Sequence, residues 1–192
     1  MKISPKYTDE NWRTLELSVD SPQSKWQEAV GILHDRIDGR FLKFVRQIEA
    51  NEFAGFAVMA LDCLLIETLQ QFREGQEETP RGQSGCYFYS FLTETSFGKW
   101  FNKEKAKMFY DQIRCGILHQ AEVKGSSLIK INTPCLVQVT DDGEGLIIDR
   151  NLFHQQLKQE FEKYIQELGD PSNSQLRQKF KKKMDYICRV SS

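Results

Sequence analysis

The segment spanning residues 52–73 constrains the fold more than any other part of the sequence. Drawn as a helix, it is apolar on most of its circumference, which is typical of a helix at the centre of a bundle. Its most apolar stretch is interrupted by Asp62 and is too short to span a bilayer. The residues that make it apolar are Phe53, Phe56, Ala57, Ala60, Leu61, Leu64, Leu65, Thr68, Leu69 and Phe72.

Two further segments have the three-and-four spacing of amphipathic helices. The first follows the capping sequence Asp-Ser-Pro at residues 20–22 and runs to about residue 49. Gly31 and Gly39 lower its intrinsic stability, so we expect it to bend or break. The second covers residues 103–121. Its core stripe is Ala106, Phe109, Ile113 and Ile117.

Elsewhere the apolar period changes to two, which predicts strands. β-Branched runs at residues 127–131, 135–140 and 146–148 are separated by Asn-Thr-Pro and by Asp-Asp-Gly-Glu-Gly, and the second break is typical of a hairpin. Residues 13–19 alternate strictly as well and predict a half-buried strand. Together these segments predict a small antiparallel sheet. A helix then returns from Asn151, as a possible N-cap, to about Leu168, and a basic amphipathic segment follows it.

We therefore expect a mainly α fold. A chain of 192 residues suits one sizeable core, so residues 1–192 are predicted to be a single domain. Its core is an up-and-down helical bundle of about residues 21–122 and 150–168. A small antiparallel β-hairpin or sheet, about residues 127–149, is inserted before the C-terminal helices. The last of these is the basic helix at about residues 174–189.

The charge and cysteine content narrow the class of protein. Lysine and arginine number 26 against 27 acidic residues, so any contact with nucleic acid must be local rather than spread over a basic surface. The five cysteines are scattered singly, which favours a reducing compartment over a disulfide framework or a structural zinc site. The N-terminus lacks an apolar signal core. We expect a cytoplasmic protein with no membrane partner, no metal and no cofactor.

The most chemically informative pair in the sequence is Arg114 and His119, near the expected end of a helix. Five steps along an ideal helix put the two side chains about 140° apart, so they flank the core stripe on opposite sides. That spacing does not suit an intrahelical ion pair or a two-ligand metal site, which use three or four steps. Leu118 points away from the core, which indicates that a partner covers it. A site built from two copies of this helix across a two-fold axis meets both conditions.

The sequence IRCGILHQAE at residues 113–122 resembles bacterial members of the HEPN superfamily, the higher eukaryotes and prokaryotes nucleotide-binding domains. The bundle that carries the resemblance covers roughly residues 21–122. The resemblance implies a homodimer whose motif helices form a composite, metal-independent endoribonuclease site, with Arg114 and His119 as catalytic residues. It also implies a possible role in a toxin–antitoxin pair or antiphage defence, with a cognate antitoxin protein as a possible partner. The residue after the family's arginine is often Asn, Asp or His, and here it is Cys115.

The implied chemistry suits these side chains. Cleavage of RNA without a metal requires removal of the proton from a ribose 2′-hydroxyl and stabilisation of negative charge on the phosphate. Imidazole can act as acid or base near neutral pH, so His119 suits the first task. The guanidinium of Arg114 stays charged and presents donors that match phosphate oxygens.

Other residues around the motif have candidate roles. Glu67 interrupts an apolar helix and needs a partner, which makes it a candidate to support Arg114, and Cys115 is a second such candidate. Lys124 and the basic run at residues 177–183 could hold RNA phosphates, although such a run is more often a solvated helix face.

Two other interpretations stay open. In the first, the pair is purely structural: Arg114 pairs with Asp111 and His119 caps the helix end. In the second, the chain is a catalytically inactive module that binds nucleotide, RNA or a protein partner, which Cys115 favours.

Overall fold

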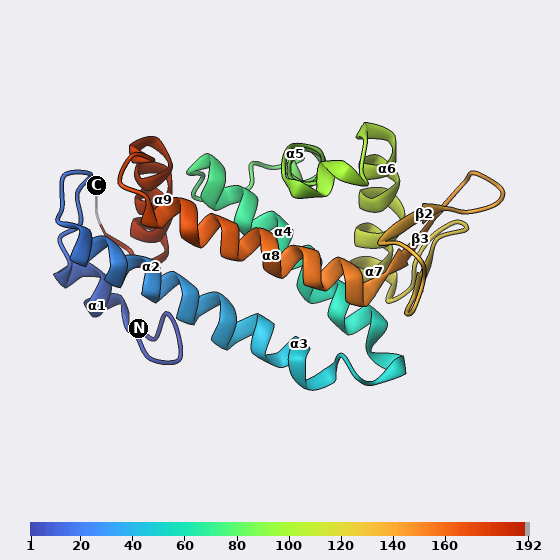
Figure 1. Cartoon of the computed structure of the whole chain (residues 1–192), viewed down its shortest axis with the longest axis horizontal. Coiled ribbons are helices and arrows are strands. Elements are labelled where there is room, and N and C mark those ends of the chain that lie inside the picture. The colour runs from blue at the N-terminus through green and yellow to red at the C-terminus, as the bar shows by residue number, and fades with distance from the viewer. Residues whose placement is uncertain (191–192) are drawn as a thin grey trace. The chain divides into compact units, whose positions relative to one another are not determined.

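The computed structural model describes residues 1–190 and is mainly helical, with a small three-stranded sheet before the last two helices (Figure 1). The expected fold class is therefore confirmed. Within residues 1–190 no helix has both the length and the apolar character that crossing a membrane requires.

The described chain forms two compact units. Unit 1 contains residues 1–44, 71–78 and, as far as the structure describes them, 161–190. Unit 2 contains residues 45–70 and 79–160. The helices α4 (Gly55–Glu74) and α8 (Arg150–Gly169) contribute residues to both units.

Unit 1 is built from α1 (Asp9–Thr14), α2 (Gln23–Ile37), the ends of α4 and α8, and α9 (Ser174–Ile187). Its core surrounds Phe180, a buried residue of α9. The Phe180 ring centroid lies 5.6 Å from that of Trp12, 6.0 Å from Phe72 and 6.2 Å from Trp26. Aromatic side chains from four separate segments thus hold this unit together.

Unit 2 contains α5 (Ser84–Glu94), α6 (Lys103–Met108), α7 (Cys115–Gln120), the sheet, and most of α3 (Lys43–Ile48), α4 and α8. Its core is a cluster of phenylalanines in which Phe153 stacks on Phe109 at 5.1 Å and meets Phe97 at 5.0 Å. This cluster fixes α8 against the helix that carries the Arg–His pair.

The long helix expected over residues 21–49 is α2 and α3 joined by a π-helical turn at Asp38–Leu42. The expected irregularity is therefore at Gly39 and not at Gly31. A Cβ at Gly39 would lie 2.4 Å from Cγ of Pro5, far inside contact distance, whereas a Cβ at Gly31 would meet nothing within 4 Å.

These two glycines give a matched pair of substitutions. We expect Gly39→Ala to destabilise the fold by about 1–3 kcal/mol, because the N-terminal segment must move to admit the methyl group. Gly31→Ala should instead stabilise it by about 0.5–1 kcal/mol through helix propensity alone. Urea unfolding of both variants measures the difference, and equal effects would show that Pro5 does not restrict this position.

The sheet contains β1 (Leu128–Lys130), β2 (Val137–Val139) and β3 (Leu146–Asp149) in the order β1-β3-β2. The hairpin of β2 and β3 is antiparallel, as predicted. β1, however, pairs with β3 in parallel, so the sheet is mixed and not purely antiparallel. Alternation in a sequence tells which side chains share a face, but it carries no information about the direction of the neighbouring strand.

The strand predicted at residues 13–19 is wrong. Arg13 and Thr14 end α1, and Glu16 has a φ of 44°, in the left-handed region, which interrupts an extended chain. Leu15 and Leu17 are both buried, as their alternation indicated. No strand of the described chain pairs with this segment, so it is an irregular connection whose apolar side chains are buried.

The N-cap predicted at Asn151, for the helix after the sheet, is also wrong. Asp149 fills that position: its Oδ1 accepts hydrogen bonds from the backbone N–H groups of Asn151 and Leu152, each at 3.0 Å. Asn151 lies inside α8. Asp149 is buried, and its Oδ2 accepts a hydrogen bond from the Thr133 backbone at 2.8 Å, so the same carboxylate also anchors the loop before β2.

Candidate functional site

The helix that carries Arg114 and His119 has three parts: α6, a π-helical segment at Phe109–Arg114, and α7. The side chain of Asn102 caps its start by accepting a hydrogen bond from Lys105 N at 2.9 Å. Its end is set by Ala121, which has a φ of 53° and donates to Ile117 O at 3.1 Å. The predicted core stripe is buried throughout. The π-helical segment has no counterpart in the sequence prediction, and such segments often occur at functional sites.

Arg114 is held from two directions. Its Nη2 lies 3.3 Å from Oε2 of Glu67 on α4, and the same carboxylate oxygen accepts a hydrogen bond from Ser84 Oγ at 3.0 Å. The guanidinium carbon lies 5.4 Å from the ring centroid of Tyr110 and 5.9 Å from that of Phe88. The structural interpretation in which Arg114 pairs with Asp111 is wrong, because Asp111 binds Lys107 Nζ at 2.7 Å.

The surroundings of Arg114 keep it charged. Burial by itself lowers the pKa of the guanidinium, but Tyr110, Glu67 and Cys115 together raise that pKa above its ordinary value. The Nε atom is buried and has no hydrogen-bond partner in the described part of the chain. Arg114 is thus a fixed cation, with 17% of its side chain exposed.

His119 is the last residue but one of α7 and is exposed. Over residues 1–190 its imidazole makes no hydrogen bond and no ion pair, so it does not contact Arg114 within one chain, nor does it cap the helix end. Leu118 beside it is 46% exposed, in agreement with the predicted outward position. Within the described residues, the same helix therefore carries a guanidinium with several contacts, Arg114, and an imidazole without a hydrogen bond or ion pair, His119.

Gly116, between the two residues, allows the chain after α7 to fold back against the motif helix. A Cβ at this position would lie 2.4 Å from the carbonyl oxygen of Glu122 and 3.2 Å from the backbone nitrogen of Lys124. The backbone N–H of Lys124 donates to Gln112 O at 2.9 Å. The half-buried Lys124, predicted to contact RNA, is thus fixed next to this helix through its backbone. Cys115 is half-buried as well.

One face of α4, and of the turn that precedes it, is apolar and exposed in the described chain. Phe53 is 87% exposed and Leu64 43%, and Phe56 and Ala57 are exposed between them. On an ideal helix these residues share an arc of about 100°, and Glu67 lies on the same arc one turn beyond Leu64. Segment 52–73 is therefore not covered on all sides, as a central helix would be. Its uncovered apolar face leads to the carboxylate that holds Arg114.

Sequence reasoning missed a buried contact between an aspartate and a histidine. Asp62 on α4 is fully buried, and its Oδ1 lies 2.7 Å from Nδ1 of His154 on α8, which is also buried. Burial raises the pKa of Asp62, and the hydrogen bond and charge of His154 offset part of that rise. Asp62 interrupts the most apolar stretch of its helix, but nothing in the sequence points to His154, because the two residues lie 92 positions apart.

The basic run at residues 177–183 is not a solvated face throughout. Arg177 is buried: its Nε donates to Leu168 O at 3.0 Å, and its guanidinium lies 4.5 Å from the ring centroid of Trp26. Lys183 is buried too and donates to the carbonyl of Glu77. Two of the cations that we considered for RNA binding therefore hold unit 1 together.

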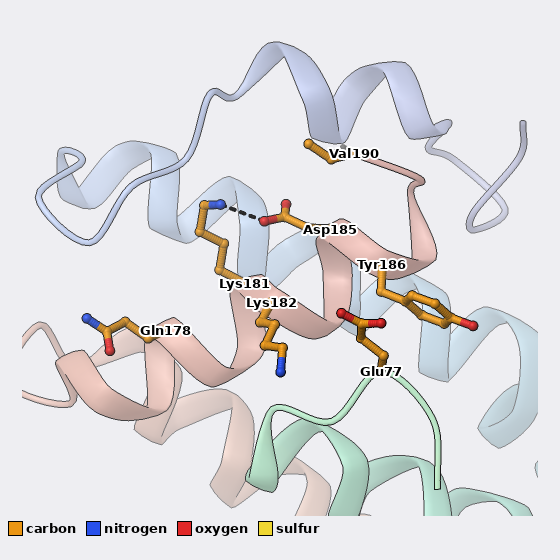
Figure 2. Close-up of a pocket in the computed structure, with 7 residues that line it drawn as sticks. All are labelled: Glu77, Gln178, Lys181, Lys182, Asp185, Tyr186 and Val190. Carbon is orange, nitrogen blue, oxygen red and sulfur yellow. Dashed lines mark hydrogen bonds and ion pairs between the residues drawn. The ribbon is translucent and has the colours of Figure 1, made fainter. Parts of the chain in front are cut away.

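The groove beside this run has mixed charge (Figure 2). It has a volume of about 570 Å³ and lies within unit 1. Lys181 on one wall is paired with Asp185, so its charge is largely compensated. The wall residues are Glu77, Gln178, Lys181, Lys182, Asp185, Tyr186 and Val190. Neither Arg114 nor His119 belongs to it, and we assign it no role in the Arg–His site.

In the described chain no group of three or more His, Cys, Asp or Glu side chains is arranged to hold a metal ion. Comparison of the chain with family models, with curated proteins and with solved structures gives no match.

Proposed function

We propose that the chain is a metal-independent endoribonuclease of the HEPN type, active as a homodimer whose two-fold axis brings two Arg114–His119 helices together. The observation that carries the proposal is the contrast within one helix. Arg114 contacts Glu67 and two aromatic rings, whereas His119 is exposed and makes no hydrogen bond or ion pair within the described residues. A second copy of the helix would give such an imidazole its reaction partner.

The proposed reaction needs two proton transfers and one stabilised phosphate. One His119 removes the proton from the ribose 2′-hydroxyl, whose oxygen then attacks the adjacent phosphorus. The bond to the 5′-oxygen breaks, and the second His119 donates a proton to that leaving oxygen. The products are a 2′,3′-cyclic phosphate and a 5′-hydroxyl. The Arg114 side chains stabilise the negative charge that grows on the phosphate oxygens.

The apolar face of α4 and the exposed Leu118 support the dimer. From residue 53 to residue 67 this face is about 20 Å long, since a helix rises about 1.5 Å per residue. Exposed apolar patches of this kind commonly mark contact surfaces. Since the face leads to Glu67, a partner seated on it would lie next to the Arg114 side chain.

Glu67 gives the proposal a test that does not remove a reacting group. We expect Glu67→Gln to lower kcat by about 10-fold with little change in KM, because a guanidinium without its anionic partner is less well oriented. Glu67→Asp should recover part of the loss. Glu104→Gln, which removes an exposed carboxylate of α6, serves as the control and should leave kcat unchanged. A change in KM alone would mean that Glu67 contributes to binding and does not position Arg114.

The role in the cell is part of the proposal. A ribonuclease that needs no cofactor suits a toxin or an antiphage effector that a cognate antitoxin protein restrains. The competing proposal, an inactive module that binds nucleotide, RNA or a protein, is favoured by Cys115, which stands where the resembled family often has a polar residue.

A further inference from the structure

A second cation, far from the motif in the sequence, is buried and has no anionic partner among residues 1–190. Arg150, the first residue of α8, is 1% exposed. Its Nη2 donates to the carbonyls of Asn51 at 2.6 Å and of Glu49 at 3.3 Å. Its Nε and Nη1 are buried and have no hydrogen-bond partner in residues 1–190. None of the carboxylates that the structure describes forms an ion pair with it.

The carboxylate of the adjacent acid is not hydrogen-bonded to this guanidinium. Asp149 uses Oδ1 on the first N–H groups of α8 and Oδ2 on the Thr133 backbone. Arginine keeps its proton in proteins, so Arg150 cannot escape the cost of burial by becoming neutral. Two carbonyl dipoles offset only part of the cost of a buried charge, and the rest is normally offset by an anion.

Arg150 lies on the wall of a pocket at the N-terminal end of α4. The pocket has a volume of about 320 Å³ and is lined by Glu52, Gly55, Ile129, Lys130, Ile131 and Arg150, all of unit 2. A Cβ built on Gly55 would lie 3.7 Å from Nη1 of Arg150 and 3.3 Å from Cγ2 of Ile129. The unpartnered Nη1 therefore lies directly behind Gly55, at the wall of the pocket that this glycine lines.

The electrostatics of this pocket favour an anion. Lys130 adds an exposed positive charge, and the dipole of the 20-residue helix α4 adds partial positive charge at this end. The carboxylate of Glu52 is the opposing negative group among the lining residues, and it is exposed. The two cations and the helix end would together favour a doubly charged anion over a singly charged one.

We propose that this pocket binds the phosphate group of a small phosphate monoester, with Arg150 Nη1 and Lys130 Nζ as its donors. The site uses neither Arg114 nor His119, so its test is independent of the ribonuclease proposal. It differs from a purely structural clamp in one respect. A clamp needs only the two carbonyls that Arg150 already contacts, whereas a phosphate site predicts saturable binding that depends on Lys130 and on the small size of Gly55.

The probe is inorganic phosphate, measured by calorimetric titration and by the thermal unfolding of the full chain at constant ionic strength. We expect saturable binding, and a rise in melting temperature that follows RT ln(1 + [L]/Kd) and does not occur with chloride. Lys130→Gln should weaken binding about 10-fold, the usual effect of losing one charged hydrogen bond. Glu52→Gln should tighten it, because the variant removes a repulsive charge. Glycerol phosphate should compete with inorganic phosphate.

Two variants separate the site from general electrostatics and from folding. Gly55→Ala adds a methyl group where Nη1 meets the pocket, and the backbone at this position is ordinary helix, so the fold should persist while phosphate binding is lost. Lys99→Gln removes an exposed lysine of the same unit outside the pocket and should leave binding unchanged. Arg150→Gln should abolish binding, but it also removes the contacts to the carbonyls, so Gly55→Ala and Lys130→Gln are the decisive variants.

Three results would overturn the assignment. The first is the absence of any phosphate effect beyond that of chloride. The second is equal weakening by Lys99→Gln and Lys130→Gln, which would mean diffuse attraction to a charged surface. The third is binding of an RNA oligomer that lacks a terminal phosphate, lost in Lys130→Gln, with no binding of inorganic phosphate. That last result would assign the pocket to a nucleic-acid backbone and not to a small ligand.

Discussion

His119→Ala is expected to abolish RNA cleavage while leaving the fold intact. The imidazole is exposed and makes no hydrogen bond or ion pair within the described residues, so its loss should cost almost no stability. General acid–base catalysis contributes about 10²–10⁴-fold, and the proposed site loses both its base and its acid with this one substitution. The assay is cleavage of a labelled RNA in excess chelator, with the cyclic phosphate end identified, alongside a thermal unfolding curve.

Arg114→Ala should lose activity to a similar extent, because removing a donor to the reacting phosphate costs about 10²–10³-fold. Here the structure adds a stability cost that the sequence did not indicate. The substitution removes the ion pair to Glu67 and the contacts with Tyr110 and Phe88, which we expect to cost about 1–2 kcal/mol. Arg114→Lys keeps the charge and is the control for folding.

Activity that persists in both alanine variants would falsify the Arg114–His119 site. A wild-type protein that cleaves no RNA would instead favour the inactive binding module. In that case Cys115→Asn is the first substitution to try for recovery of activity, since Cys115 is the departure from the resembled family's pattern. Gain of cleavage in that variant would locate the defect next to Arg114.

Leu64→Asp and Leu118→Asp are expected to convert a dimer into monomers and to remove cleavage with it. Both side chains are more than two-fifths exposed, so a carboxylate there can be hydrated in the monomer, whereas burial against a partner would cost several kcal/mol. A specific dimer buries roughly 800 Å² per partner, and two charged groups at its centre should prevent it from forming at micromolar concentration. Sedimentation equilibrium and the cleavage assay test the two consequences.

Leu152→Asp is the matched control for the dimer variants, because it adds the same charge to an exposed leucine of α8. It should remain dimeric and active. A wild-type chain that sediments as a monomer would remove the composite site, and with it the mechanism. A dimer unaffected by Leu64→Asp and Leu118→Asp would place the interface on another surface.

The helix of Arg114 and His119 shows which structural features the local sequence pattern predicts and which it does not. The apolar spacing of residues 103–121 predicted the core stripe and the outward position of Leu118, because helical periodicity indicates which face is buried. It gave no sign of the π-helical segment at Phe109–Arg114, since that departure depends on how the helix packs and not on its own period. For Arg114 the sequence offered both Asp111 and Glu67 as partners. The position of α4 decides between them, because it places Glu67 Oε2 3.3 Å from Arg114 Nη2, while Asp111 pairs with Lys107.

The same division holds across the chain. By itself the sequence predicted α2, α4, α8, α9, the helix of the Arg–His pair and the β2–β3 hairpin, because these depend on spacing along a few turns of chain. It did not predict α1 or the exposed apolar face of α4. The tertiary structure alone decided which distant groups meet. It paired Asp62 with His154, set β1 parallel to β3 and buried Arg177 against Trp26. It also left Arg150 without a contacting anion in the described part of the chain. Such pairings depend on where separate elements lie in space. A hydrophobic period indicates that one face of an element is buried, but it does not indicate which other element packs against that face.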